Sequence, residues 1–196
     1  MQATGKDGRN IRVMADTTEI RDKVQRAKAA IIAALEAEAL RAGADIAALV
    51  ENRIVDKGQK ADGGTLSPYS TKPVPAFFYL GKSRNNAGEN AVKKKAKQKQ
   101  PISYRDFRQI NGLNVGHKSL EFTGEMWQGF GPVSARTIRP GIVEVTIGGR
   151  NERTSSLLGY HSDREGTNIT EPSREELRII TVGINERFKK IAEEIL

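Results

Sequence analysis

The chain has 196 residues, a formal net charge of +8 and no cysteine. This length is enough for one domain with a hydrophobic core. The absence of cysteine excludes disulfides, thiolate metal sites and a cysteine nucleophile. No apolar run approaches the ~18 residues of a membrane-spanning helix, and the first residues lack an apolar signal segment. We therefore expect no membrane span and no secretory signal.

The N-terminal quarter of the chain predicts a flexible arm followed by helix. Residues 1–16 are polar and show no sustained period. Helix is expected from Thr17 or Thr18, because apolar residues then recur at steps of three and four. This stripe consists of Ile20, Val24, Ala27, Ile31, Ala34, Leu35 and Ala39. We expect Gly43 to end or kink the helix and Asp45 to cap a second helical piece, which gives a long helix or a helix pair.

A stretch rich in Gly and Pro, at about 58–101, predicts a long extended loop inserted into a single domain that spans 17–196. Connections of this length are unusual inside a compact domain unless they bind something. One apolar patch interrupts the insertion and supplies the candidates for a subunit interface: Phe77, Phe78, Tyr79 and Leu80. The alternative for this patch is docking onto the core of the same chain.

The end of the insertion is strongly basic. Five lysines lie within seven residues: Lys93, Lys94, Lys95, Lys97 and Lys99. A run of like charges is commonly a solvated, mobile loop. The alternative is contact with DNA or with an acidic partner, because positive side chains attract phosphates without reading sequence. These lysines are therefore the candidates for contact with DNA or an acidic partner.

The clearest strand pattern lies within 133–149. One strand shows strict alternation of its apolar residues: Val143, Val145 and Ile147. Alternation with a period of two places these side chains on one face of a strand. The sequence Arg139-Pro140-Gly141 predicts a turn before this strand, and β-branched residues at 133–138 predict an antiparallel partner. Large apolar side chains precede this hairpin, and we expect Trp127 and Phe130 in the core.

The remaining segments predict helices and one further strand. A short helical stretch is expected around Tyr104 and Phe107, which share a face; we expect these rings in the core, with a base-stacking platform as the alternative. Another short helix is expected to end near Gly166. Residues 178–182 predict a strand, and Asn185 is expected to cap a final amphipathic helix. The whole pattern predicts an α+β fold with a small antiparallel sheet built on the central hairpin.

The sequence offers little that could carry a reaction. His117 and His161 are its only histidines, and a zinc site needs several suitably spaced ligands. His161, Asp163 and Glu165 come closest to a ligand cluster, but a hydrogen-bonded helix end is the simpler interpretation. No phosphate loop and no nucleophile elbow is present. We therefore expect no catalytic residue, no metal site and no cofactor, and we do not expect an enzyme.

Several fragments taken in order resemble one protein family. They are DGGTLSPYS at 62–70, LEFTGEMWQGF at 120–130, VEVTIGG at 143–149, LLGYHSDREG at 157–166 and EPSREEL at 171–177. They lie between the expected N-terminal helix pair and a terminal amphipathic helix. In this order the chain resembles the tail-completion (virion morphogenesis) proteins of tailed bacteriophages. The resemblance covers roughly residues 18–70 and 119–196.

This resemblance implies a structural virion protein with an α+β fold and no enzymatic activity. It implies a neck component that forms a homo-oligomeric ring at the head–tail junction, found in the virion and, during assembly, in the host cytoplasm. The implied partners are the head connector, the tail tube or tail terminator, and non-specific DNA passing through the ring. The alternatives are a tail terminator, a head-completion connector protein or a basic nucleic-acid-binding protein.

Overall fold

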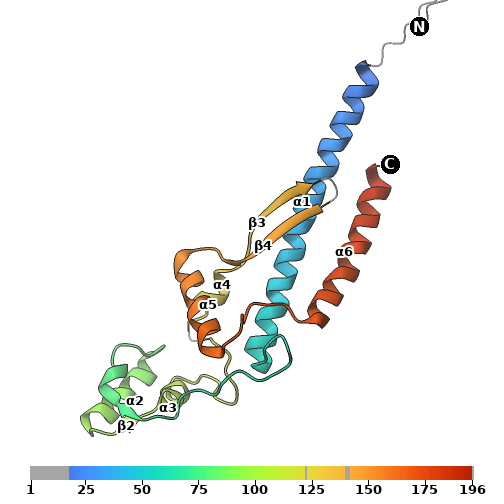
Figure 1. Cartoon of the computed structure of the whole chain (residues 1–196). Helices are drawn as coiled ribbons and strands as arrows, with labels where there is room; N and C mark the ends of the chain where they lie inside the picture. Colours follow the sequence, from blue (N-terminus) through green and yellow to red (C-terminus); the bar gives the residue numbers. More distant parts are fainter. Residues whose placement is uncertain (1–17, 122, 140–141, 196) are drawn as a thin grey trace, which may run out of the picture.

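The computed structural model of the chain describes residues 18–121, 123–139 and 142–195 (Figure 1). It confirms the α+β class, with a long N-terminal helix, two small antiparallel sheets and a C-terminal helix. The expected N-terminal arm and the Pro140-Gly141 turn lie outside the described residues. No helix within the described ranges combines the length and the apolar character that crossing a membrane requires.

Helix α1 spans Thr18–Lys57 as one continuous helix of 40 residues, which corresponds to a length of about 60 Å. The prediction that Gly43 ends or kinks it is wrong. A Cβ atom at Gly43 would lie 2.8 Å from Cγ1 of Val145 and 3.3 Å from Cβ of Pro132. The glycine is therefore the place where a sheet approaches the helix backbone closely. Asp45 caps nothing, because it lies in mid-helix.

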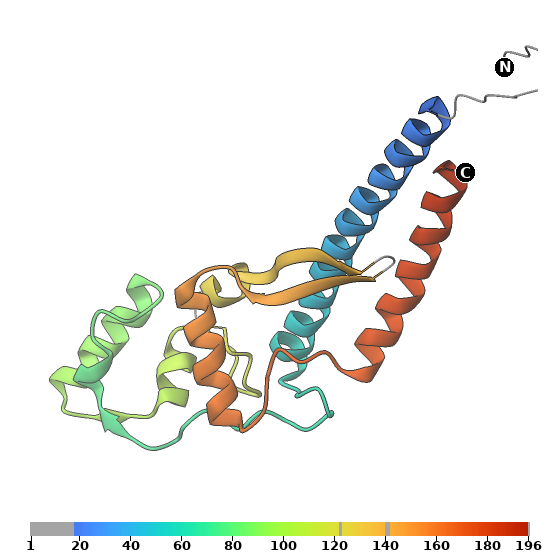
Figure 2. The same ribbon diagram turned by 45° about the horizontal axis from the view of Figure 1, so that its top comes forward.

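The predicted hairpin is confirmed. Strand β3, Phe130–Arg139, pairs antiparallel with β4, Ile142–Gly149. The register places Ala135 opposite Val145 and Thr137 opposite Val143. The side chains of β4 alternate between half-buried and exposed, as the period of two predicts. Figure 2 shows the hairpin lying across α1, which covers one of its faces.

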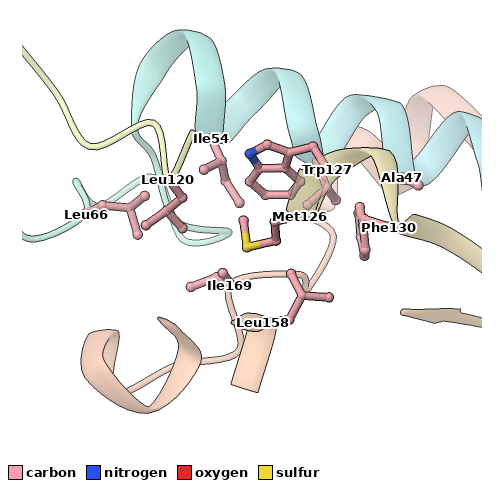
Figure 3. Close-up of a cluster of buried hydrophobic side chains, with 10 residues drawn as sticks. Ala47, Ile54, Leu66, Leu120, Met126, Trp127, Phe130, Leu158 and Ile169 are labelled. Carbon is pink, nitrogen blue, oxygen red and sulfur yellow. The ribbon is translucent and has the colours of Figure 1, made fainter. Parts of the chain in front are cut away.

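The main core lies where α1 meets α4, Glu125–Gln128, and α5, Glu152–Glu165 (Figure 3). Its buried members are Ala47, Val50, Ile54, Leu66, Leu120, Met126, Trp127, Phe130, Leu158 and Ile169. The Trp127 and Phe130 rings meet edge to face with centroids 5.8 Å apart. This burial confirms the prediction that both residues belong to the core.

Helix α6, Arg174–Ile195, runs antiparallel beside α1 in both views (Figures 1 and 2). The predicted strand at 178–182 and the predicted cap at Asn185 are both wrong, because the helix begins before the first and passes through the second. The helix starts with a reciprocal cap: the Ser173 N–H donates to Glu176 Oε2 (2.6 Å), and the Glu176 N–H donates to Ser173 Oγ (3.2 Å). This cap fixes the start of the helix eleven residues before Asn185.

Much of the Gly- and Pro-rich insertion is folded rather than extended. Residues 58–73 contain no helix, and a small lobe follows, which we define as residues 74–112. It consists of β1 (Val74–Pro75), η1 (Ala76–Tyr79), α2 (Asn86–Lys97), β2 (Pro101–Ile102) and α3 (Tyr104–Ile110). Ala76, Val92, Ile102 and Phe107 form its own buried core. Only 2% of Phe107 is exposed, so the core interpretation of this ring is correct and the base-stacking platform is wrong.

Candidate functional site

The predicted apolar patch divides between the surface and the core of the small lobe. Phe77 and Phe78 are 57% and 53% exposed, and their rings stack on each other with centroids 4.4 Å apart. Leu80 is also exposed. Tyr79 instead faces inward and stacks on Phe107 at 4.5 Å. The exposed part of the patch is therefore an aromatic pair with an adjacent leucine.

The lysine run forms one end of helix α2. Four of the lysines lie in the helix, and Lys99 follows it with a positive φ of 54°. Val92 anchors the helix in the small-lobe core with no exposed surface, and the Asn85 side chain caps its start. Lys93 and Lys94 are exposed, and positive charge near a helix C-terminus is favourable. The expectation of a mobile loop is therefore wrong: these charges are held on a folded helix.

Two further apolar surfaces face outward on the main body. Every residue from Thr18 to Ile31 is exposed, and both views show the first part of α1 projecting beyond the hairpin (Figures 1 and 2). On the hairpin, Val133 and Ile138 are each 53% exposed. Of the apolar stripe predicted for the start of α1, the part from Ile20 to Ile31 is exposed, whereas Ala34, Leu35 and Ala39 are partly buried.

A buried ionic cluster joins the start of the insertion to the end of α5. The wholly buried carboxylate of Glu165 accepts from Lys118 Nζ at 2.6 Å and from the backbone N–H and hydroxyl of Ser67 at 2.9 and 3.0 Å. Lys60 Nζ lies 3.6 Å away. Burial alone would raise the pKa of Glu165, but the bonds from Lys118 and Ser67 outweigh it and lower that pKa to about 2. Glu165 is thus a structural anion rather than a proton donor.

A pocket of about 530 Å³ opens beside this cluster. Its walls come from residues 68–70, from α3, from residues 118–121 and 123–126, and from α5. The apolar side is formed by Leu120, Met126 and Leu157, and three tyrosine rings border it: Tyr69, Tyr104 and Tyr160. Its charged groups are four cations and two carboxylates: Arg108, Lys118, Arg153, Arg164, Glu121 and Glu125. The pocket therefore combines an apolar wall with an excess of positive charge.

His161 lines this pocket and is half-buried. Burial, and then the charges of Lys118 and Arg164, lower the pKa of His161 despite the opposing charge of Glu165, so its ring is neutral at pH 7. Its Nδ1 atom is buried without a hydrogen-bond partner among the described residues. His117 differs, because its Nε2 lies 2.7 Å from the Val55 carbonyl oxygen and it takes no part in the pocket.

The proposed ligand cluster does not form. His161 and Glu165 both lie near Lys118, but Asp163 is exposed, and the described ranges hold no group of three or more residues suited to a metal ion. Sequence reasoning singled out His161 but missed Arg108 and Arg164. No local signal could have found them, because the pocket draws on segments spread from residue 68 to residue 164.

Comparison with known proteins adds no relative. No protein-family model matches the chain, no curated protein matches it, and no solved structure matches it.

Proposed function

We propose that the protein is a structural component of a tailed-bacteriophage virion, a tail-completion or neck protein that assembles as a ring at the head–tail junction. The motif order of the sequence motivates the proposal. One structural observation supports it most: the central sheet has only two strands, and neither outer edge pairs with another strand of the described chain. Unpaired edges are templates for pairing with a further chain.

The hairpin suits repeated contact between identical copies. When the outer edge of β4 in one copy pairs with the outer edge of β3 in the next, the two surfaces differ, so the contact is heterologous and repeats by rotation into a ring. Part of the β3 edge is already occupied, since the Thr137 N–H donates to Glu36 Oε1 of α1 at 3.2 Å. The exposed part of β3 before Thr137 begins at Val133, which adds apolar area, because Phe130 and Gly131 are buried.

Other surfaces fit the same assembly. The start of α1, with its exposed apolar residues, and the small lobe, which carries exposed Phe77 and Phe78, lie at opposite ends of the molecule in both views (Figures 1 and 2). A neck component contacts different partners above and below its ring, and two separate apolar surfaces suit that requirement. The lysines of α2 suit a ring through which DNA passes, because attraction to phosphate needs no sequence readout.

The test has two parts, the first on the purified protein. Negative-stain microscopy and light scattering should show closed rings, and Val133→Lys should abolish them, because a charged side chain beside a sheet edge opposes pairing. Ser156→Lys, on an exposed position of α5, is the matched control and should leave the rings intact. Rings that survive Val133→Lys would refute pairing through the hairpin, and rings that survive Phe77→Ser would exclude the aromatic pair from the subunit interface.

The second part places the protein in the particle. Antibody labelling of purified virions should mark the head–tail junction. Labelling elsewhere on the particle would reassign the part, for example to a tail terminator distant from the neck. Unlabelled particles would refute a structural virion role and bring forward the alternative of a basic nucleic-acid-binding protein, which the exposed lysines of α2 favour.

A further inference from the structure

A charge imbalance among the cations that line the pocket points to a ligand. Three cations are buried in the described chain: Arg53, Arg108 and Lys118. Arg53 pairs with Glu176 at 3.0 Å, and Lys118 pairs with Glu165 at 2.6 Å. Arg108 makes no ion pair with any described residue, although it is only 1% exposed. A buried charge normally has a counter-charge, because its removal from water is otherwise costly.

The guanidinium of Arg108 is held by neutral groups. It donates to the carbonyl oxygens of Asn114 at 3.3 Å and Glu121 at 2.6 Å and to the Ser119 hydroxyl at 3.3 Å. Its carbon atom lies 4.1 Å from the centroid of the Tyr69 ring. These contacts fix its position but leave its charge in place, so it raises the electrostatic potential of the adjacent pocket.

A second uncompensated cation lines the same pocket from α5. Arg164 donates to the Tyr160 hydroxyl at 2.8 Å and lies over that ring at 5.7 Å, and it forms no ion pair with the described residues. Arg153, by contrast, is neutralised by Glu125 at 2.8 Å. Glu121 is the remaining carboxylate of the wall, and its backbone carbonyl, rather than its carboxylate, accepts from Arg108.

Leu120, Met126 and Leu157 give the pocket an apolar lining, and His161 lines it as well, with its Nδ1 atom buried and without a hydrogen-bond partner among the described residues. A volume of about 530 Å³ lies within the usual range for sites that hold a small organic ligand. We propose that this pocket binds a small organic anion, with its oxyanion group held by Arg164 in the positive potential of buried Arg108, close to His161, and its apolar or aromatic body against Leu120, Met126 and Leu157. The oxyanion is a phosphate or a carboxylate, which share this recognition chemistry.

The two histidines allow a direct test by proton NMR of the full chain, with the His117→Gln variant assigning the resonances. Three probes contain a phenyl ring: phenyl phosphate, phenylacetate and the neutral benzyl alcohol. Inorganic phosphate is the fourth probe, an anion without a ring. We expect at least one of the two ring anions to shift the His161 resonances at millimolar concentrations while His117 stays unchanged. The ring anion that binds with the higher affinity identifies the preferred oxyanion. Benzyl alcohol and inorganic phosphate should each bind at least roughly tenfold more weakly than that anion, because each lacks one of the two contacts.

Arg164→Gln should weaken binding of the better anion roughly tenfold, since it removes one charge-assisted contact from an exposed side chain that the fold does not require. Arg178→Gln, at an exposed arginine on α6 outside the pocket, is the matched control and should bind as the wild type does. The proposal is overturned if neither ring anion shifts His161, if benzyl alcohol binds as tightly as both anions, or if Arg164→Gln leaves the affinity unchanged. None of these results depends on whether the protein forms rings.

Discussion

Glu165 is the side chain on which the joint between the insertion and α5 depends. Its carboxylate is the counter-charge for buried Lys118 and receives two donors from Ser67. We expect Glu165→Gln to destabilise the fold by about 3–5 kcal/mol, because it leaves a buried ammonium without its partner. Urea denaturation measures this change. Glu175→Gln breaks an exposed pair with Arg178 (2.7 Å) and should cost less than about 1 kcal/mol; equal effects would contradict the structural role of Glu165.

The same carboxylate predicts a specific dependence of stability on pH. Its pKa is about 2 in the folded protein and 4.5 ordinarily, so its stabilisation is complete above about pH 4.5 and is lost as the pH falls toward 2. Proton linkage lowers the free energy of unfolding by about 2 kcal/mol at pH 3, and by up to about 3 kcal/mol at still lower pH. Denaturation curves at pH 7 and pH 3 should show this loss in the wild type. Glu165→Gln should lack this component, and an identical pH response in the two proteins would refute the assignment.

We expect the replacement of two helical glycines by alanine to change the stability of the fold in opposite directions. At Gly43 the new methyl group would collide with Val145 at 2.8 Å, so we expect Gly43→Ala to cost about 1–3 kcal/mol through displacement of the hairpin. At Gly159 of α5 nothing lies within 4 Å, so Gly159→Ala should stabilise by about 0.5–1 kcal/mol through helix propensity alone. Thermal unfolding of both variants shows whether each substitution raises or lowers the stability relative to the wild type. Stabilisation by Gly43→Ala would mean that the hairpin does not approach α1 this closely.

Gly43 also shows what the sequence can and cannot predict. A glycine after an apolar helical stripe is a common C-terminal signal, and nothing local distinguishes that use from close approach of a distant sheet. The alternation in β4 predicted its strand and its buried face correctly, because a period of two is itself a local property. The pocket could not be predicted, because Arg108, Lys118 and Arg164 meet only after the chain has folded.

Among the helices, α6 and α2 depart most from the sequence prediction. The β-branched residues of 178–182 favour a strand in isolation, but Ile180 is buried in a helix that packs along α1. Tertiary packing and the cap at Ser173 outweigh that local preference. In α2, the lysines conceal a helix whose one fully buried side chain, Val92, docks it to the small lobe. The sequence does carry a local helix signal, because Gly88, Val92 and Ala96 follow one another at steps of four behind the Asn85 cap, but the surrounding Gly and Pro residues favour a loop.

The small lobe should unfold apart from the main body, because its core is a separate cluster. Phe107→Ala removes its largest buried ring, a loss typically worth about 3–5 kcal/mol. We expect hydrogen exchange in α2 and α3 to become fast while the buried half of α1 stays protected. Phe78→Ala, at an exposed ring of the same lobe, is the control and should leave protection unchanged. Equal loss of protection in α1 would show that the two cores unfold together.

For the molecule as a whole, the net charge of +8 is the property that bears most on the proposed contact with DNA. We expect the protein to bind duplex DNA weakly and without sequence preference, with affinity that falls steeply with salt. Lys93→Glu with Lys94→Glu should reduce the slope of log K against log salt by about 1–2, as anisotropy titrations measure. The control is Lys189→Glu with Lys190→Glu, another adjacent exposed pair, on α6. An equal reduction in both variants would mean that the overall charge, rather than α2, determines binding.

The pairing of α1 with α6 has a consequence during protein synthesis. Arg53 and Glu176 are separated by 123 residues. Buried Glu38 and exposed Asp45 of α1 share a partner, Arg187, which comes still later in the chain. At ordinary translation rates of about 5–20 residues per second, α1 leaves the ribosome roughly 6–25 s before its partner helix exists. During that interval the side of α1 that α6 covers in the folded protein is exposed to solvent. The nascent chain should therefore engage holding chaperones through the second half of α1, and it should be released when α6 emerges.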